Sequence, residues 1–445
     1  MATGIPSKNG NTSNFINKNI SFQLNYDGKT PTEHILTSKP AKLKRVVTVE
    51  HSLKNKLIYG ENLRVLSFLL NDKAIAGKVG LIYIDPPYAT GSSFESRKSD
   101  HAYHDCMEGA VYLEFLRQRL ILLKELLSEQ GAIYVHLDEN MAFPVKIIMD
   151  EIFGARNFRN WITRKKCNPK NYTRKQYGNV ADYILFYTKT DKYTWNQPFE
   201  AWTEAAIKKE YQYIEEGTGR LYKKVPIHAP GTRKGSTGQP WRGMLPPPGK
   251  HWQYTPKTLD EMDARGEIYW SPTGNPRRKV YLDNSQGIGV QDIWLDYKDA
   301  HNQNIKITGY PTEKNPDLLK RIILASSNTG DLVLDAFAGS GTTAAVAEEL
   351  GRQWITIDNS PLAIATIIKR LVQGSEVMGD FVNGHTQSQQ MSLINTNRIL
   401  HSGLEFYIEE HSELEIIDEF LIKDWDNKLN VDTEYIGFLN IQNVI

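Results

Sequence analysis

The stretch LIYIDPPYATG, residues 81–91, joins an apolar segment to a corner that contains two prolines. Its first four residues have no helical period, and a short apolar run of this kind is typical of a strand buried on both faces. Pro86 and Pro87 prevent both a continued helix and continued ladder pairing, because each ring fixes φ and removes an N–H donor. In open α/β sheets, ligands bind at the carboxyl ends of strands. We therefore expect a stiff corner that holds Asp85 and Tyr88 at a ligand site, and we favour this interpretation over a simple turn.

Strands and helices alternate on both sides of the central part of the chain. Residues 55–155 contain three strand–helix pairs, and one of the helices shows leucines in steps of three and four, an amphipathic pattern. The alternation resumes at 331–372 with two more strands, which cannot bury their own faces alone. They should complete the sheet that begins at residue 55. The expected fold is α/β, with one doubly wound, mostly parallel sheet built from both ends of the chain.

The composition changes between these two halves. Residues 156–304 are dense in Pro, Gly, Trp and Tyr, as in TGQPWRGMLPPPGKHWQY at 237–254, which predicts an inserted α+β domain with short strands and long loops. The two ends of the chain show no clear period. The predicted organisation is an N-terminal arm at 1–50, a first half of the sheet at 51–155, the insertion at 156–304, a second half of the sheet at 305–375 and an acidic extension at 376–445.

The overall composition limits the class of protein. The chain has 445 residues, of which 40% are apolar, as expected of a globular protein with more than one unit. No apolar run is long enough to cross a membrane, and the first residues lack the apolar core of a signal peptide. Cys106 and Cys167 are too few for a zinc cluster, and a reducing cytoplasm is the simplest compartment.

Charge is distributed unevenly although the net charge is only +1. Residues 155–181 contain eight Lys and Arg and no acid, whereas residues 401–445 contain eleven acids and two Lys. A basic run can be ordinary solvated surface, but one that is interleaved with Asn and Tyr suits phosphates and bases. The residues that we predict to contact nucleic acid are Arg164, Lys165, Lys166, Lys170, Arg174 and Lys175.

A second motif, DAFAGSG at 335–341, lies between an apolar strand and a helix. Gly339 and Gly341 allow a tight turn and a close ligand, and Thr342 opens a helix whose N-terminal N–H groups are free. Asp358 ends the next strand, where an acid can bind a ribose diol. No third glycine and no Gly-Lys-Ser/Thr follow, which favours a nucleoside cofactor without a pyrophosphate over NAD or ATP. A structural turn with a capping acid is the alternative.

The two motifs together resemble those of the S-adenosylmethionine-dependent DNA amino-methyltransferases. D85-P-P-Y88 is similar to the catalytic motif of that family, and the Phe-x-Gly-x-Gly of 335–341 is similar to its cofactor motif. Their order resembles the circularly permuted beta group, which includes restriction–modification methyltransferases and the Mod subunits of type III systems. The resemblance covers roughly 55–375 and implies a permuted Rossmann-like methyltransferase fold, in which 156–304 is the target recognition domain.

The resemblance also implies roles for individual residues. Asp85 and the carbonyl of Pro86 would accept hydrogen bonds from the target amino group, and Tyr88 would stack on the flipped base. A further family motif, Thr-Gln-Lys-Pro, corresponds to TEKN at 312–315, where Glu313 and Asn315 depart from it. The catalytic set is Asp85, Pro86, Pro87 and Tyr88, and the cofactor set is Glu61, Thr312, Lys314, Asp335, Phe337, Gly339, Gly341, Thr342 and Asp358.

This chemistry explains the composition of the corner. An exocyclic amine is a poor nucleophile because its lone pair is delocalised into the ring, and two acceptors aimed at its hydrogens favour a pyramidal nitrogen. The target base cannot be reached inside a duplex and must be flipped out. We expect a DNA adenine-N6 methyltransferase, and the alternatives are a cytosine-N4 enzyme, a catalytically idle DNA-specificity subunit and an RNA methyltransferase. Double-stranded DNA is the expected partner, with a cognate restriction endonuclease and a second copy of the chain as further candidates.

Overall fold

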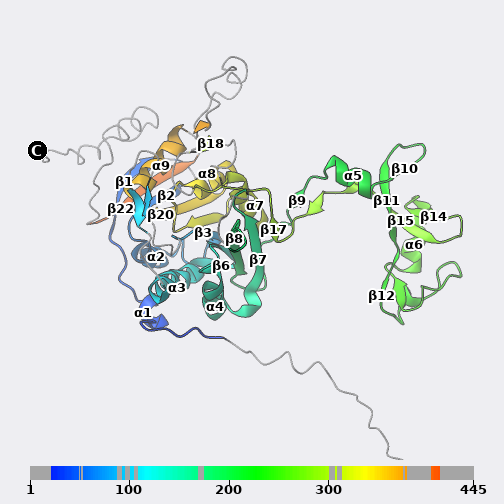
Figure 1. Ribbon diagram of the computed structural model, residues 1–445, viewed down its shortest axis with the longest axis horizontal. Coiled ribbons are helices and arrows are strands. Elements are labelled where there is room, and N and C mark those ends of the chain that lie inside the picture. Colours follow the sequence, from blue (N-terminus) through cyan, green and yellow to red (C-terminus); the bar gives the residue numbers. More distant parts are fainter. Residues whose placement is uncertain are drawn as a thin grey trace, which may run out of the picture. The chain divides into compact units, whose positions relative to one another are not determined.

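The computed structural model describes residues 22–49, 51, 54–87, 93–95, 101–104, 109–168, 175–299, 306–307, 313–373, 376–377 and 402–410. The chain divides into two compact units, one of which is the continuous segment 197–290. The larger unit is formed by the residues on either side of that segment (Figure 1). None of the helices in the described ranges combines the length and the apolar composition that a membrane span requires.

A ten-stranded sheet forms the centre of the larger unit. Six neighbouring strands, from β22 through β2, β20, β19 and β3 to β6, pair in parallel. Strands β1, β8 and β7 add antiparallel pairs at the two sides, and β17 closes one edge in parallel with β7. The mostly parallel sheet that the sequence predicts is therefore confirmed. In spatial order the strands are β1 (Leu43–Val49), β22 (Gly403–Glu409), β2 (Lys54–Tyr59), β20 (Gln353–Asp358), β19 (Leu332–Asp335), β3 (Val79–Ile84), β6 (Leu127–Leu137), β8 (Ala181–Thr188), β7 (Phe158–Lys165) and β17 (Ile293–Trp294).

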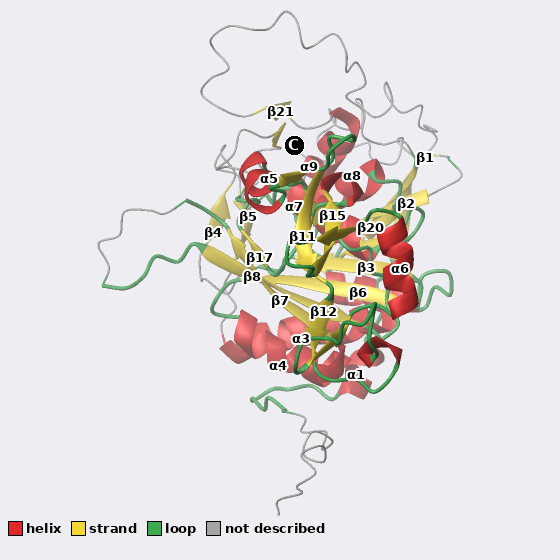
Figure 2. Cartoon of the chain, turned by 90° about the vertical axis from the view of Figure 1, so that its right-hand side faces the viewer, coloured by secondary structure: helices red, strands yellow, loops and turns green. Residues whose placement is uncertain are grey.

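Helices cover both faces of this sheet. Helices α2, α3 and α4 lie on one side of the central strands, and α7, α8 and α9 lie on the other (Figures 1 and 2). The leucine stripe of α3 forms the core as predicted, since Leu116, Leu120 and Leu123 are fully buried. Strands β19 and β20 lie between β2 and β3, so the sheet is built from both ends of the chain, as the alternation indicated. The helices are α2 (Asn62–Leu70), α3 (Gly109–Leu126), α4 (Ala142–Phe153), α7 (Pro316–Ser326), α8 (Thr342–Glu349) and α9 (Pro361–Gln373).

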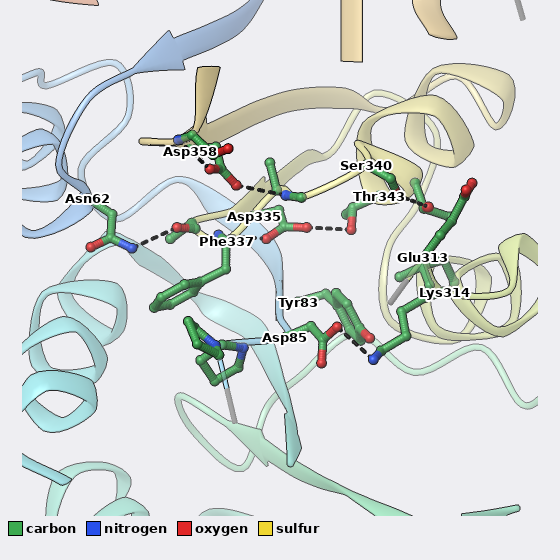
Figure 3. Close-up of a pocket in the computed structure, with 18 of the residues that line it drawn as sticks. Asn62, Tyr83, Asp85, Glu313, Lys314, Asp335, Phe337, Ser340, Thr343 and Asp358 are labelled. Carbon is green, nitrogen blue, oxygen red and sulfur yellow. Dashed lines mark hydrogen bonds and ion pairs between the residues drawn. The ribbon is translucent and has the colours of Figure 1, made fainter. Parts of the chain in front are cut away.

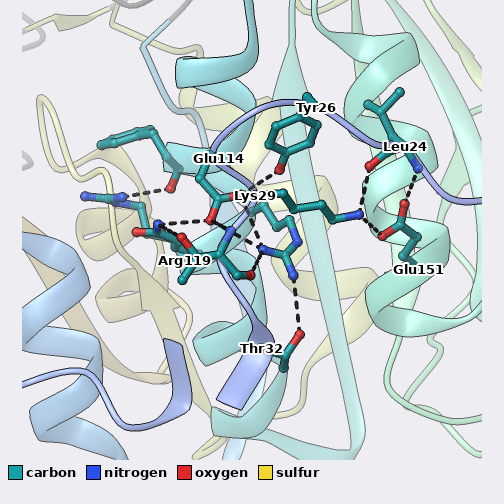
Figure 4. Close-up of polar contacts among 11 residues, drawn as sticks. Leu24, Tyr26, Lys29, Thr32, Glu114, Arg119 and Glu151 are labelled. Carbon is teal, nitrogen blue, oxygen red and sulfur yellow. Dashed lines mark hydrogen bonds and ion pairs between the residues drawn. The ribbon is translucent and has the colours of Figure 1, made fainter. Parts of the chain in front are cut away.

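Part of the predicted N-terminal arm belongs to the fold. Residues 22–49 contain the helix α1 (Thr32–Leu36) and the edge strand β1. Figure 4 shows how the segment before α1 is fixed to the helices α3 and α4: the Tyr26 hydroxyl donates to Glu114 at 2.7 Å, and Lys29 Nζ lies 2.8 Å from a carboxylate oxygen of Glu151. The prediction of an arm over 1–50 is therefore wrong for this part. Polar contacts, the burial of Ile35 and Ala41 and the pairing of β1 hold the segment, and its few apolar residues form no regular period in the sequence.

The acidic C-terminal extension contributes the strand β22, which lies between β1 and β2. Its Glu405 is buried and pairs with Arg45 at 2.9 Å and with Lys56 at 2.5 Å. Glu409 lies 2.9 Å from Arg64. Some acids of the extension therefore neutralise cations within the sheet unit.

The separate unit is shorter than the predicted insertion. We expected residues 156–304 to project from the sheet, but β7, β8 and β17 are strands of it, and only 197–290 forms a second unit. The reason is that β8 pairs along β6 and buries Ile184 and Leu185 in the unit's interior. The basic segment between β7 and β8 makes the composition of this region differ from that of the sheet, so the pairing of β8 with β6 could not be recognised in the sequence.

The 197–290 unit is a small α+β structure with its own core. A four-stranded antiparallel sheet, β10-β11-β15-β14, is accompanied by two short strand pairs, β12–β13 and β9–β16. Its buried residues include Trp241, Trp252, Leu259 and Ile268. The elements are β9 (Phe199–Glu200), α5 (Glu204–Glu210), β10 (Tyr213–Ile214), β11 (Leu221–Pro226), β12 (His228–Pro230), β13 (Lys250–Trp252), α6 (Pro256–Ala264), β14 (Ile268–Trp270), β15 (Pro276–Tyr281) and β16 (Ile288–Gly289). Two further strand pairs of the chain are β4 (Ser93–Glu95) with β5 (His101–His104) and β18 (Lys306–Ile307) with β21 (Glu376–Val377).

Candidate active site

Three aspartates lie at the carboxyl ends of three neighbouring parallel strands. Asp85 follows β3, Asp335 ends β19 and Asp358 ends β20, and the order β20-β19-β3 places these ends at one edge of the sheet. A pocket opens there, and all three carboxylates surround it (Figure 3). This is the place where an open α/β sheet binds its ligand.

The Asp85 carboxylate makes an ion pair across the pocket. Its Oδ2 lies 2.8 Å from Lys314 Nζ, and the two side chains are only 18% and 10% exposed. Pro86 and Pro87 line the pocket beside them. Tyr88, the last residue of the predicted corner, lies outside the described residues. The fold thus brings the proline corner and the predicted lysine together from distant parts of the sequence.

Asp335 shapes the glycine loop that follows it. This residue is 3% exposed, its Oδ1 accepts the N–H of Phe337 at 2.9 Å, and its Oδ2 accepts the hydroxyl of Thr343. Burial is the main reason why the pKa of Asp335 rises to about 7; the two hydrogen bonds lower it, and the negative charges of Asp85 and Asp358 raise it. Phe337, also predicted to be a cofactor residue, lines the pocket.

Asp358 holds the same loop from the neighbouring strand. Its Oδ2 accepts the N–H of Gly339 at 2.8 Å, and its Oδ1 accepts the N–H of Ser360 at 2.9 Å. Gly339 has a φ of 50°, a conformation that favours glycine. Burial raises the pKa of Asp358 to about 6, although the backbone N–H groups lower it. A carboxylate has acceptor sites beyond two hydrogen bonds, so Asp358 retains capacity toward the pocket that it lines.

Gly341 is required by packing against α9. Its φ is 71°, and a Cβ at this position would lie 2.7 Å from Cγ1 of Ile367. The residues on either side, Ser340 and Thr342, line the pocket, whereas Gly341 is not among the lining residues. The sequence motif therefore contains two glycines with different functions, one at the pocket and one against a helix.

Arg370 connects two walls of the pocket, and the sequence analysis missed it. Its Nη2 donates to Oε1 of Glu313 at 2.7 Å, and its Nη1 donates to the carbonyl of Ser340 at 2.8 Å and to Oγ1 of Thr342 at 2.9 Å. Both charged side chains are almost fully buried. The signal in the sequence is a charged residue three positions after Ile367, within the apolar stripe of α9.

The second departure from the Thr-Gln-Lys-Pro motif is a helix cap. Asn315 precedes α7, and its side-chain oxygen accepts the N–H of Asp317 at 2.9 Å. Lys314 is thus held between a buried acid, Glu313, and a helix N-cap, which fixes the backbone from which its side chain reaches Asp85. Thr312 lies outside the described residues.

Glu61 caps a helix and pairs with an arginine, whereas the next residue, Asn62, lines the pocket. The Glu61 carboxylate accepts the N–H of Arg64 at 3.0 Å as the N-cap of α2, and it pairs with Arg119. Asn62 is a lining residue, and its Nδ2 donates to the carbonyl of Ala336 at 2.9 Å. Of these two residues, Asn62 is therefore the one that faces the pocket.

A chain of buried polar groups extends behind the pocket. The Tyr83 hydroxyl lies 2.8 Å from Nδ1 of His136, whose Nε2 lies 3.0 Å from Asp182. Arg164 Nη1 lies 2.8 Å from the same aspartate, and its Nη2 lies 2.8 Å from Asp299. The prediction that Arg164 contacts DNA is therefore wrong: its guanidinium is fully buried and neutralised by two acids from distant positions.

Other cations of the predicted DNA-binding run lie nearer the surface. Lys175 is exposed, Lys165 is partly exposed, and Lys166 lies 3.9 Å from Glu139. Two predicted members lie outside the described residues, namely Lys170 and Arg174. In the described ranges, no group of three or more His, Cys, Asp or Glu side chains is arranged to hold a metal ion.

Comparison with known proteins identifies the family. The family model described as DNA methylase matches residues 79–369. The chain is 49% identical over 398 residues to the type II methyltransferase M.EcaI of Enterobacter cloacae, with 87% of each chain covered. It is 30% identical over 365 residues to the Mod subunit of the type III restriction-modification enzyme StyLTI of Salmonella typhimurium, covering 71% of this chain and 54% of that subunit.

A solved structure is also similar. The cytosine-N4-specific PvuII DNA methyltransferase is 13% identical, with a TM-score of 0.42 and coverage of 85% of this chain and 94% of that chain. The family match spans more than half of the chain and includes the proline corner, the glycine loop and the 197–290 unit. The chain belongs to the N6/N4 DNA methylase family.

Proposed function

We propose that this DNA methyltransferase transfers the methyl group of S-adenosylmethionine to the N6 amino group of adenine at a specific DNA sequence. The observation that carries the proposal is the position of Asp85 on the wall of the pocket that Asp335 and Asp358 also line. An acceptor for the target amine and a loop suited to a nucleoside then share one cavity. The family uses S-adenosylmethionine, which supplies an electrophilic methyl group when bound.

The lining of the pocket fits the parts of S-adenosylmethionine. The Phe337 ring offers an apolar surface for an adenine ring, and the Asp358 carboxylate can accept hydrogen bonds from a ribose diol. Lys314 lines the pocket and offers an ammonium group for the carboxylate of the methionine end. Ser340 and Thr342 add hydroxyl groups on the same wall.

The corner after β3 activates the amine. Asp85 and the Pro86 carbonyl accept its two hydrogens, favour a pyramidal nitrogen and stabilise the positive charge that develops on it. The ion pair with Lys314 fixes the direction of the Asp85 carboxylate, and positioning of this kind supplies much of the rate in a group transfer. Tyr88 stacks on the flipped base in this proposal, a contact worth about 1–3 kcal/mol.

The assignment to adenine rests on the first residue of the D-P-P-Y corner. The family resemblance associates an initial Asp with adenine N6 and an initial Ser with cytosine N4. The same two acceptors can serve the cytosine amine, so cytosine N4 is the alternative outcome of the test.

We also propose a biological setting for the enzyme and a separate role for each of its two units. Relatives named as a type II methyltransferase and as a type III Mod subunit favour a role in a restriction–modification system, with a cognate nuclease as partner. The substrate is then double-stranded DNA of the host, which places the enzyme in the cytoplasm. The sheet unit performs the transfer, and the 197–290 unit contributes to the choice of the DNA sequence. A second copy of the chain is a further candidate partner.

One experiment identifies the base, its position in the sequence and the recognition site. The full chain is expressed in a bacterial host without endogenous DNA methylation, and the chromosomal DNA is sequenced with detection of modified bases. We expect N6-methyladenine at one recurring sequence. N4-methylcytosine at a recurring sequence would replace the adenine assignment, and unmodified DNA in cells that contain folded protein would contradict the proposed function.

A further inference from the structure

One face of the four-stranded sheet in the 197–290 unit carries tyrosines and cations. Side chains alternate along a strand, so Tyr222 and Lys224 of β11 point to the same face. The antiparallel register places Tyr281 opposite Tyr222 and Lys279 opposite Lys224, and it places Tyr269 opposite Arg277. We call this set the tyrosine–cation face: Tyr213, Tyr222, Lys224, Tyr269, Arg277, Lys279 and Tyr281.

The tyrosines hold the cations in place. Nζ of Lys224 lies 3.4 Å from the ring centroid of Tyr269 and 3.7 Å from that of Tyr213, so two aromatic rings contact one ammonium. Lys279 lies 5.4 Å from the Tyr222 ring and forms an ion pair with Glu215 at 2.8 Å. A cation that is already ordered by its neighbours loses less conformational entropy when it binds an anion.

The sheet buries its other face. Ile268 and Trp270 of β14 pack with Leu259 and Met262 of α6 in the core of the unit. On the tyrosine–cation face, Arg277 is exposed and Tyr213 is 39% exposed, whereas Tyr222 and Tyr281 are buried. A surface pocket there is lined by Tyr213, Lys224, Tyr269 and Arg277, together with Lys209, Lys223 and one acid, Glu210, which pairs with Lys223. The face is thus concave and predominantly cationic.

Charge in this part of the chain favours an anionic partner. Residues 217–259 contain eight Lys and Arg and no Asp or Glu; three of these cations, Arg220, Lys223 and Arg242, pair with acids outside this range. Within the described part of the chain, neither Lys224 nor Arg277 forms an ion pair with a carboxylate. Burial lowers the pKa of His228, and the nearby charges of Lys250 and Arg277 lower it further, as expected in a positive local potential.

We propose that the tyrosine–cation face binds the phosphate backbone of duplex DNA, with Lys224 and Arg277 as the phosphate ligands and with Tyr213 and Tyr269 as the residues that position Lys224. This inference rests on the proposed function, since it takes the DNA substrate as the partner. It assigns DNA contacts to residues of the 197–290 unit, in addition to those predicted for the basic segment between β7 and β8. Lysine, arginine and tyrosine are common donors to phosphate oxygens, and such contacts fix the orientation of a protein on DNA.

The test compares two pairs of substitutions in the full chain. Lys224→Gln with Arg277→Gln removes two charges from the face. Lys257→Gln with Arg265→Gln removes one exposed charge from α6 and one from its C-cap, and α6 packs against the opposite face. Affinity for duplexes with and without the methylation site is measured by fluorescence anisotropy over a range of salt concentrations. Thermal unfolding and calorimetric titration with S-adenosylmethionine check that each variant is folded.

We expect the first pair to weaken binding to both duplexes at least about tenfold. It should also reduce the slope of log affinity against log salt by about two units, one for each phosphate group that the variant no longer neutralises. The control pair should leave the slope unchanged. Tyr269→Ala should weaken binding about fivefold, whereas Tyr269→Phe, which keeps the ring beside Lys224, should stay within about twofold of the wild type.

Three results would overturn the inference. The first is an unchanged slope in the Lys224→Gln, Arg277→Gln chain, and the second is an equal loss in the control pair. The third is a change of molar mass in light scattering caused by the face substitutions, which would assign the face to a protein partner. Methylation of the same duplexes by the wild-type chain is measured as well. If the wild-type chain methylates DNA and the face variants bind DNA normally, only this inference fails. If the wild-type chain methylates no DNA, the proposed function fails.

Discussion

At the residue scale, the site places four carboxyl groups close to one lysine in a single cavity. Asp85, Glu313, Asp335 and Asp358 line the pocket, and Lys314 pairs with the first of them. Each acid has a different partner, so the groups have different chemical properties. Asp335 is buried beneath the glycine loop with a raised pKa, whereas Asp85 faces the cavity through an ion pair. Of these acids, Asp85 is the one beside the proline corner, and its direction is fixed by Lys314, so it is the acid that we propose as the acceptor for the target amine.

The raised pKa of Asp335 predicts a pH-dependent contribution to stability. Its pKa is about 7 in the folded chain against an ordinary value of 3.8, so the folded state keeps the proton over a range in which the unfolded state has lost it. Between about pH 4 and about pH 7, the Asp335 carboxyl is ionised in the unfolded state but protonated in the folded state. The free energy of unfolding therefore falls over this range, by at most about 4 kcal/mol. Asp335→Asn removes this cost. The stability of the variant relative to the wild type should therefore be higher at about pH 8 than at about pH 5.

Urea unfolding at the two pH values measures this difference, and the exposed Asp191→Asn serves as the control. A relative stability of Asp335→Asn that does not change between about pH 5 and about pH 8 would show that Asp335 ionises normally in the folded chain.

At the element scale, the strand β22 shows how the ends of the chain complete the sheet. It pairs with β1 on one side and with β2 on the other, and β2 in turn pairs with β20, the strand that ends at Asp358. Its central acid, Glu405, is 7% exposed in its side chain and contacts both Arg45 and Lys56. An unpaired buried charge is costly, so the three side chains must be considered together.

Glu405→Gln is predicted to destabilise the fold. The substitution keeps the size of the side chain but leaves Lys56 without its carboxylate, and a loss of about 1–3 kcal/mol in the free energy of unfolding is expected. Glu410→Gln, which changes an exposed acid directly after the same strand, is the matched control and should change stability by less than about 0.5 kcal/mol. Equal urea midpoints for the two variants would contradict a structural role of Glu405.

The comparison of elements also shows what the sequence can predict. The buried strand before Asp85, the leucine stripe of α3 and the strand–loop–helix around 335–341 are local patterns, and the structure contains all three. Strands β7 and β8 are long-range pairs, and the basic, Asn-rich segment between them led to the wrong boundary at 156. Arg164 looked like a surface cation because its acids, Asp182 and Asp299, are distant in the sequence.

At the scale of the whole molecule, the two ends of the chain together build the sheet unit that contains the pocket. The middle segment, 197–290, forms the second unit. The proline corner comes from the first half of the sequence, and the glycine loop and Lys314 come from the second half. Pairing of β19 with β3 brings them to one edge of the sheet. The order of the two motifs was readable from the sequence, but the ion pair between Asp85 and Lys314 and the link through Arg370 depend on side-chain contacts that no local pattern encodes.

The central claim is that Asp85 acts on the target amine and does not bind the cofactor. The most direct test measures the transfer of a radioactive methyl group from S-adenosylmethionine to duplex DNA by Asp85→Ala and by the surface control Asp191→Asn. Cofactor affinity is determined by calorimetry on the same preparations. The account predicts that Asp85→Ala loses at least about 10²-fold in transfer rate, because one of two acceptors is removed, while its cofactor affinity stays within about threefold of the wild type. Near-normal transfer by Asp85→Ala, or a loss that is explained by failure to bind the cofactor, would contradict the account.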